Sequence, residues 1–229
     1  MGSLTGKTIV VTGALGVLGR AVATAAEAAG AQVARVDYAR AGAPAELLFD
    51  GVDLADEAAA GAAMASIAQA CGAIHGLANV AGGFTWSLVA DSPAASWEAM
   101  FRMNLLTALG ASRAARPYLA KAKGAAIVNM GANAASRAAA GMGPYTASKA
   151  AVLRLTEALA EELAGDGVRV NAVLPSIIDT PANRTDMPKA DFSAWVQPDD
   201  IARVIVFLLS DDAHAITGAA VPVTVGRKR

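Results

Sequence analysis

Short apolar segments alternate with longer, alanine-rich segments along the whole chain, and this alternation limits the folds that the chain can adopt. The apolar segments contain many β-branched residues in unbroken runs, which favours strands buried on both faces. They lie at 8–11, 32–36, 76–80, 126–129, 168–173 and 220–224, and segments of helical length lie at 20–29, 56–70, 94–121, 144–164 and 198–209. Because no repeat, charge block or long linker divides the chain, we predict one doubly wound α/β domain with a parallel sheet over residues 1–229.

The charge balance and the N-terminal sequence argue against several classes of protein. The chain has 19 Lys+Arg and 20 Asp+Glu, and its C-terminal basic run is only Arg227–Arg229, so we expect no nucleic-acid partner. The charge-free residues 71–90 include His75 and Asn79, whose polar groups a membrane helix would leave unsatisfied. We see no secretory leader or myristoylation motif at the N-terminus and expect a cytoplasmic protein without a membrane partner.

Cysteine and histidine are too few to indicate metal or disulfide chemistry. Cys71 is the single cysteine and has no intrachain partner, so we interpret it as a small buried apolar residue. His75 and His214 have no serine or carboxylate at a useful spacing, and we interpret both as structural. We expect no metal site.

A glycine-rich turn follows the first predicted strand and precedes the first predicted helix, in the order T-G-A-L-G-V-L-G. Glycines at such a place permit a tight turn, close approach of the backbone to a pyrophosphate and close packing of helix on sheet. The helix N-terminus also offers free N–H groups to an anion. The predicted cofactor-binding residues of the turn are Gly13, Leu15, Gly16, Val17, Leu18 and Gly19.

An aspartate ends the second predicted strand, where an acidic side chain can bind the adenosine ribose of a dinucleotide. Asp37 would accept hydrogen bonds from the ribose hydroxyls and repel a 2′-phosphate, so we expect NAD(H) to be preferred over NADP(H). The alternative is a turn or helix-cap aspartate, and Arg35 and Arg40 leave a 2′-phosphate open. Asp53 and Leu54 are further candidates to face the adenine.

A tyrosine and a lysine four residues apart open the helix predicted over 144–164. Tyr145 and Lys149 would lie on one helix face, so the ammonium would favour the ionised phenol. A free phenol has a pKa of about 10 and is a poor base at neutral pH without such a neighbour.

Together with the glycine turn, these residues resemble the short-chain dehydrogenase/reductase family over nearly the whole chain. The matching elements are the T-G-x-x-G-x-x-G turn, Asp53, Asn79 through Gly82, Asn104, the Y-x-x-x-K pair and Pro175 through Thr180. The resemblance implies a Rossmann-type fold and hydride transfer between a nicotinamide and a small carbonyl or alcohol substrate. It also implies a homodimer or homotetramer.

The resemblance also implies a role for each matching residue. Tyr145 would be the general acid or base, Lys149 would bind the nicotinamide ribose, and Asn104 would hold a water in the proton relay. Ile178 and Thr180 would contact the carboxamide of the nicotinamide. The other positions that the resemblance assigns to the cofactor are Asn79, Ala81, Gly82 and Pro175.

The chain departs from the family pattern at three places. The middle glycine of the turn, Gly16, stands one residue early, and Ser176 replaces a glycine. The catalytic serine of the family is missing, because positions 131–133 read Gly-Ala-Asn. Asn133 is a candidate to donate a hydrogen bond to the substrate oxygen in its place, and Ser136 is a candidate if the loop bends inward.

Two alternatives to carbonyl reduction stay open. Dihydropteridine reductase, a family member that also lacks this serine, is similar in the turn, in Val80–Phe84, in Met130–Ala135 and in a substrate lid at about 179–197, which suggests reduction of a quinonoid dihydropterin or an imine. The Asn104 motif and the Ser-Lys pair that ends at Lys149 instead look like ordinary carbonyl reductases. The second alternative is a protein that binds NAD or scaffolds an assembly without turnover.

Three aromatic residues lie in loops after predicted strands, at the edge where doubly wound sheets bind ligands. Phe84, Trp86 and Trp195 are candidates for an apolar wall of the substrate pocket. Core packing is the alternative for each of them.

Overall fold

The computed structural model describes residues 2–43 and 45–225 and contains one parallel sheet of seven strands. The strand order is β3-β2-β1-β4-β5-β6-β7, so the chain builds outward from β1 and then returns to place β4 on the other side of β1. The predicted doubly wound sheet is thereby confirmed. The strands are β1 Thr8–Thr12, β2 Gln32–Val36, β3 Leu48–Phe49, β4 Gly76–Asn79, β5 Ala126–Met130, β6 Arg169–Pro175 and β7 Ala220–Val223. The predicted basic tail Arg227–Arg229 lies outside the described residues.

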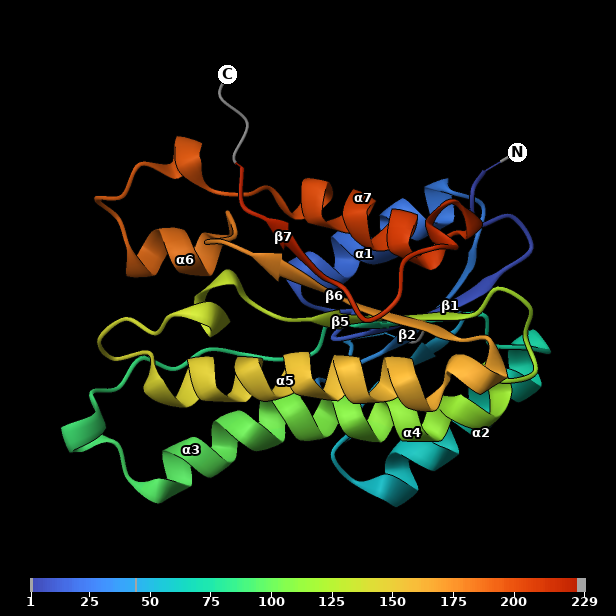
Figure 1. Cartoon of the computed structure of the whole chain (residues 1–229), viewed down its shortest axis with the longest axis horizontal. Helices are drawn as coiled ribbons and strands as arrows, with labels where there is room; N and C mark the ends of the chain where they lie inside the picture. Colours follow the sequence, from blue (N-terminus) through green and yellow to red (C-terminus); the bar gives the residue numbers. More distant parts are fainter. Residues whose placement is uncertain (1, 44, 226–229) are drawn as a thin grey trace.

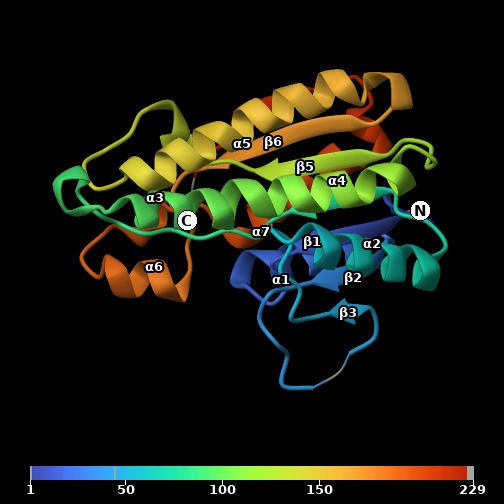
Figure 2. The same ribbon diagram turned by 90° about the horizontal axis from the view of Figure 1, so that it is seen from below.

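Helices cover both faces of the sheet (Figure 1). On one face α1 (Val17–Ala28) packs against α7 (Pro198–Leu209). On the other face lie α2 (Glu57–Cys71), α4 (Thr107–Leu119) and α5 (Gly143–Glu162), which Figure 2 shows from below. The helix predicted over 94–121 is continuous but not uniform, since α3 (Ala94–Phe101) passes through a π-helical turn, Arg102–Leu106, into α4.

The strands are buried on both faces because successive side chains enter different cores. In β1, Ile9 and Val11 pack in the core under α1 and α7, and Val10 packs in the core under α2 and α4. All three side chains are completely buried. Full burial of one such side chain contributes about 1.5–3 kcal/mol, so unbroken apolar runs of this kind stabilise the centre of the sheet.

One strand and one short helix were not among the predicted elements. β3 has only two residues, at the edge of the sheet, and pairs with β2 alone. Within the predicted lid, 179–197, lies α6 (Pro181–Asp186). The base of this segment is closed by a bridge between Ile178 and Val196 and by a hydrogen bond from the Asp179 N–H to the Val196 carbonyl, 2.9 Å. α6 lies at the end of the molecule toward which β6 runs (Figure 1).

None of the helices in the described part of the chain combines the length and hydropathy that a membrane span needs. The same residues contain no group of three or more His, Cys, Asp or Glu placed to hold a metal ion. Cys71 ends α2 and is half-buried, and burial raises the pKa of its thiol.

His75 has the structural role that the sequence predicted for it. Its Nδ1 accepts a hydrogen bond from the Thr8 N–H at 3.0 Å, which ties the start of β1 to the residue before β4. This bond requires a neutral imidazole, and burial, followed by the charge of Lys7, lowers the pKa of His75 from 6.5.

The protein should therefore lose stability as the pH falls below about 6.5, because the unfolded chain takes up the imidazole proton more readily than the folded chain. Thermal unfolding of the wild type and of His75→Gln at pH 7 and pH 5 measures this effect. Glutamine keeps an acceptor for the Thr8 N–H and does not titrate, so the variant should lose less stability between the two pH values. Equal losses would show that another group causes the pH dependence.

Candidate active site

The glycine turn between β1 and α1 leaves its backbone open on one side. Gly13 has a positive φ of 64°, and a Cβ there would lie 2.8 Å from Ala81 Cα, so the turn packs directly on the residues after β4. A Cβ on Gly19 would collide with the Gly13 carbonyl oxygen, which fixes how closely α1 approaches the turn. Gly16, the N-cap of α1, is different, because a Cβ there would approach only the Gly13 carbonyl oxygen, at 3.3 Å.

Thr12 connects β1 with β4, the two neighbouring strands at which the order of strand addition reverses. Its hydroxyl accepts hydrogen bonds from the N–H groups of Val80 at 3.0 Å and Ala81 at 3.1 Å, and it donates to the Ala78 carbonyl at 3.4 Å. This point between β1 and β4 is where doubly wound sheets bind ligands. The turn pattern includes Thr12 but does not reveal this role, because the hydroxyl bonds residues that are distant in the sequence.

Asp37 lies beside the turn, as the prediction required. Its carboxylate accepts hydrogen bonds from the N–H of Leu15 and from the N–H of Ala39, both at 2.8 Å. The nearby cations have other contacts: Arg35 forms an ion pair with Glu27 at 2.6 Å, and the guanidinium of Arg40 lies beside Gly51. The Asp37 carboxylate is therefore held against the turn, and Arg20 also bonds the turn, because its Nε donates to the Leu15 carbonyl at 2.9 Å.

The two candidates for the adenine side are held differently. The Asp53 carboxylate forms an ion pair with Arg102 at 2.6 Å and accepts the Ala55 N–H at 2.9 Å. The side chain of Leu54 is buried in the core under α2 and α4. Only the backbone of Leu54 is left to contact a cofactor.

The Asn79 side chain points into the interior, so only the backbone of Asn79 is left for the predicted contact with the cofactor. Its amide nitrogen donates to Asn129 Oδ1 at 2.9 Å and to Ser112 Oγ at 3.0 Å, and Asn129 donates in turn to Thr156 Oγ1 at 2.9 Å. These bonds connect β4 and β5 with α4 and α5. Asn79 lies in β4, where successive side chains face opposite sides of the sheet, and its position directs it into the helical layer.

The backbone that follows β4 passes over two predicted catalytic residues. A Cβ on Gly82 would lie 2.5 Å from Asn104 Oδ1 and 3.3 Å from Lys149 Nζ. The buried amide of Asn104 holds the next residue, Gly83, by accepting its N–H at 3.0 Å and donating to its carbonyl at 3.1 Å. Asn104 itself lies in the π-helical turn, a deformation that is frequent at functional sites.

Asn104 also connects this loop to the start of α5. Its amide nitrogen donates to Ser148 Oγ at 3.0 Å, and the Ser148 hydroxyl donates to the Tyr145 carbonyl at 2.7 Å. Lys149, one turn after Tyr145, donates from Nζ to the Met130 carbonyl at the end of β5, at 2.8 Å. The structure thus brings Asn104, Tyr145 and Lys149 to one place, as the sequence predicted.

The electrostatic state of the pair differs from the expectation. Burial raises the pKa of Tyr145 to about 12, whereas the predicted effect of the lysine was to lower it. Burial also lowers the pKa of the Lys149 amine to about 8. The expectation failed because it considered only the charge of the neighbour, and in this fold both groups are removed from water.

No hydroxyl is held where the family carries its serine. Ala132 is buried with an extended backbone, and Asn133 is exposed at the start of a 3₁₀ turn, Asn133–Ser136, that packs against α5. The exposed Ser136 hydroxyl donates to the Asn133 carbonyl at 2.8 Å. The inward bend proposed for Ser136 is therefore absent from this structure.

The residues after β6 form the base of the 179–197 segment. Pro175 is the last residue of β6 and pairs with Val223 of β7. The hydroxyl of Thr180 accepts the Asn183 N–H at 3.2 Å and so caps α6. Thr180 keeps its own O–H as a donor.

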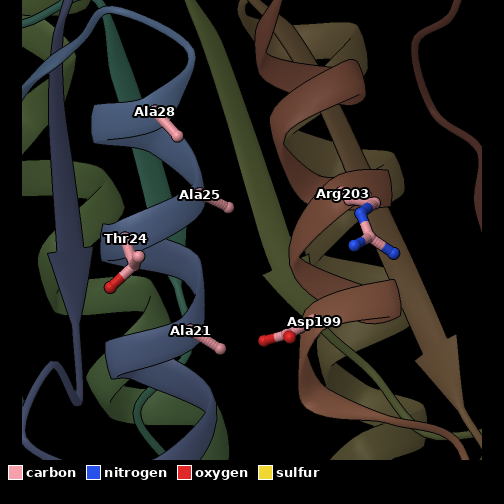
Figure 3. A pocket seen from close by; sticks show the side chains of 6 residues that line it. All are labelled: Ala21, Thr24, Ala25, Ala28, Asp199 and Arg203. Atoms are coloured by element: carbon pink, nitrogen blue, oxygen red, sulfur yellow. The ribbon is translucent and has the colours of Figure 1, made fainter.

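A shallow hollow of about 300 Å³ between α1 and α7 contains none of the predicted site residues. Figure 3 shows its lining, which consists of Ala21, Thr24, Ala25 and Ala28 on α1 and Asp199 and Arg203 on α7.

Known proteins resemble this chain over nearly its whole length. A sequence model of the family described as enoyl-(acyl carrier protein) reductase matches residues 13–228. 2-(S)-hydroxypropyl-CoM dehydrogenase 3 of Xanthobacter autotrophicus is 33% identical, with 97% of each chain covered. A protein of the same organism named inactive 2-(S)-hydroxypropyl-CoM dehydrogenase 2 is also 33% identical, over 90% of this chain and 98% of its own.

Solved structures show the same fold. The carveol dehydrogenase of Mycobacterium avium, in complex with NAD, superposes with a TM-score of 0.87 at 25% identity, covering 99% of both chains. A blue fluorescent protein from a metagenomic library, in complex with NADPH, superposes with a TM-score of 0.88 at 29% identity, covering 98% of both. The matches and the shared fold show that this chain belongs to the short-chain dehydrogenase/reductase family of oxidoreductases.

Proposed function

We propose that this protein is an NAD(H)-dependent oxidoreductase that interconverts a small carbonyl compound and its alcohol, with Tyr145 as general acid and base. The observation that carries the proposal is the bonded group at the start of α5, in which Asn104 and the Met130 carbonyl hold the helix turn that bears Tyr145 and Lys149. A protein that only bound a dinucleotide would need the glycine turn but not this group.

The residues at the turn fit a nicotinamide dinucleotide. The first N–H groups of α1 have no partner within the helix, and the open side of Gly16 lets a pyrophosphate approach them. Asp37 stands beside the turn for the adenosine ribose, and the segment from Ala81 to Gly82 leads from the turn to Lys149. When bound, the cofactor supplies or accepts the hydride.

Tyr145 moves the proton that accompanies hydride transfer. In reduction, the carbonyl carbon gains the hydride, and the phenol O–H gives its proton to the oxygen, so an alcohol and the oxidised cofactor result. With a pKa of about 12 the phenol of the free protein is protonated at neutral pH and ready to donate. Lys149 Nζ donates one N–H to the Met130 carbonyl, and its other N–H donors remain to bind the nicotinamide ribose.

Because the serine is missing, the loop beside Tyr145 offers at most one side-chain hydrogen-bond donor to the substrate oxygen. Ala132 has no side-chain donor, so we propose the exposed amide of Asn133 as the group that assists in binding the substrate oxygen. Asn133 adjoins α5 through its 3₁₀ turn, which supports this role.

The direct test is to incubate the purified protein with NADH and a panel of aldehydes, ketones, imines and quinonoid dihydropterin and to follow the loss of reduced nicotinamide. Turnover of aldehydes or ketones is the expected result. Turnover of the dihydropterin alone would favour the pterin-reductase alternative, which the missing serine motivates. Binding of NADH without any turnover would favour a non-catalytic role, which the relative named inactive motivates.

We further propose that NADH is the better cofactor, because the Asp37 carboxylate fixed at the turn would repel a 2′-phosphate. Asp37→Asn removes that charge but keeps an oxygen that can accept the Leu15 N–H. The ratio of kcat/KM with NADH to kcat/KM with NADPH should therefore fall by about tenfold. Fluorescence titration with NADH and NADPH and kcat/KM for each cofactor measure the change. Equal or better use of NADPH by the wild type would refute the assignment and direct attention to Arg40.

We also propose, from the family resemblance, that the protein works in the cytoplasm as a homodimer or homotetramer with a small-molecule substrate. Sedimentation velocity of the purified chain tests the subunit number, and a monomer at micromolar concentration would contradict it.

A further inference from the structure

We infer that the substrate carries an apolar, typically aromatic, group beside its carbonyl, and that this group binds on an apolar face formed by Phe84, Trp86, Leu88 and Val89. The inference rests on the proposed function, because it takes Tyr145 as the proton donor at the carbonyl oxygen. It defines the substrate class of that site, which neither the fold nor the glycine turn determines.

The apolar face is exposed to an unusual degree for one short segment. Phe84 is 51% exposed, Trp86 58%, Leu88 41% and Val89 70%. All four large side chains lie in the six-residue span 84–89, which begins five residues after the end of β4, at the ligand-binding edge of the sheet. Large apolar side chains exposed together in one short segment beside a candidate active site are typical of a binding surface.

Phe84 places this face directly against the predicted proton donor. Its ring meets the ring of Tyr145 edge to face, with 5.0 Å between centroids and an interplanar angle of 82°. The preceding residue, Gly83, is held by two hydrogen bonds with the Asn104 amide, one donated by Gly83 and one donated by Asn104. A group bonded to a carbonyl at the Tyr145 hydroxyl would therefore lie next to Phe84.

Trp86 and Val89 are anchored to the segment that leads into Tyr145. The Trp86 indole lies against Gly141, where any Cβ would collide with the ring, and the Ser87 N–H donates to the Gly141 carbonyl at 2.8 Å. A methyl group of Val89 would lie 3.6 Å from a Cβ on Gly143. The face is thus attached to the protein at several points while its outer surface stays open.

Trp195 does not belong to this face. It is 4% exposed and packs on Phe192 with 4.7 Å between centroids. Core packing and a wall of the substrate pocket were the two interpretations for Phe84, Trp86 and Trp195. Trp195 is a packing residue, and Phe84 and Trp86 remain the candidates for substrate contact.

The polar groups near the site favour a neutral, weakly polar substrate. Ala132 supplies no donor where the family has its serine. Arg184 of the 179–197 segment gives two hydrogen bonds to Asp179, at 2.6 and 2.8 Å, and its guanidinium lies over Phe192 at 4.7 Å, so its charge is compensated. With few directed hydrogen bonds available, apolar contact must supply much of the substrate's binding free energy. Because Lys189 of the same segment is exposed, the test includes an anionic substrate.

The test compares kcat/KM with NADH for acetophenone, acetoin and pyruvate. Each reaction consumes one NADH and one proton and yields the corresponding alcohol and NAD⁺. We expect acetophenone to exceed the other two by about tenfold or more, the scale of discrimination that apolar contacts give. Phe84→Ser and Trp86→Ser should each lower the acetophenone-to-acetoin ratio about threefold or more, and Phe207→Ser, which removes a 42% exposed phenylalanine on α7, should leave it unchanged.

The ratio separates this inference from the proposed function, because a general loss of activity cancels in it. Preference for acetoin or pyruvate, or a ratio unchanged in both variants, would overturn the inference while leaving Tyr145 as the acid. Full activity of Tyr145→Phe would instead overturn the proposed function. If no ketone turns over, ligand-observed NMR with acetophenone decides: binding to the wild type that Trp86→Ser weakens supports the face, and absence of binding refutes it. Dissociation of an oligomer by either serine variant, with an unchanged ratio, would identify a subunit interface.

Discussion

Tyr145→Phe should bind NADH as the wild type does and turn over carbonyl substrates about 10²- to 10⁴-fold more slowly, the range expected when a positioned general acid is removed. The substitution deletes only the hydroxyl. The ring contact with Phe84 and the hydrogen bond from Ser148 to the backbone of residue 145 do not depend on that hydroxyl, so the start of α5 should keep its structure.

Steady-state kinetics and NADH fluorescence titration measure the two effects separately. Tyr118→Phe is the matched control, because it removes the same atom from a tyrosine that borders the core under α2 and α4. Wild-type turnover by Tyr145→Phe would eliminate Tyr145 as the acid. Loss of NADH binding with normal turnover at saturation would assign it to cofactor binding instead.

The arrangement of the sheet was predictable because the apolar runs carry the signal themselves. A strand such as β1 sends Val10 to one core and Ile9 and Val11 to the other, so it must be apolar throughout, and such a run is readable without coordinates. β3 was missed because two residues, Leu48 and Phe49, are too short to form a run.

The site was predictable where a local pattern determines the geometry. The turn from Gly13 to Gly19 and the Tyr145–Lys149 spacing belong to single segments, and both lie where the sequence placed them. The direction of the Asn79 side chain depends on which face of β4 it occupies, and that follows from the packing of β4 under α4. The same holds for Trp195, whose burial against Phe192 arises from the folding of the 179–197 segment.

The pKa of Tyr145 is a further property that required the fold. Spacing along α5 shows that an ammonium is near the phenol, but the degree to which water is excluded from both depends on the segments around them. Burial dominates in the free protein, which places the phenol in the protonated form and favours it as a donor. We therefore expect alcohol oxidation, which needs the ionised phenol, to speed up as the pH rises.

Lys149→Met is expected to lower kcat/KM about 10²- to 10³-fold and to weaken NADH binding, the size of loss seen when one preorganised donor is removed. Lys149 is buried, with 4% of its surface exposed, and its amine has the Met130 carbonyl as its hydrogen-bond acceptor. Methionine keeps the length and apolar character of the stem and removes all three donors. Lys121→Met, at an exposed position in the turn after α4, is the matched control and should be without effect.

The same substitution should leave thermal stability nearly unchanged at pH 7, because two effects oppose each other. Burial that lowers the pKa of Lys149 from 10.5 to about 8 means that the ammonium destabilises the fold by a few kcal/mol, at about 1.4 kcal/mol per pKa unit. Removing it relieves that cost but leaves the Met130 carbonyl without this donor, which costs about 1–3 kcal/mol.

The pH dependence of unfolding separates a buried lysine from an ordinary one. Between about pH 8 and 10 the unfolded chain keeps the Lys149 proton while the folded chain loses it, so the free energy of unfolding of the wild type should rise with pH. Above pH 10 the folded chain keeps the Tyr145 proton while the unfolded chain loses it, so the free energy of unfolding falls again with pH. The rise due to Lys149 is therefore confined to about pH 8–10. Urea unfolding of the wild type, Lys149→Met and Lys121→Met across this window tests the expectation. A rise that persists in Lys149→Met would show that another group causes the pH dependence. Wild-type kcat/KM in that variant would show that Lys149 takes no part in catalysis.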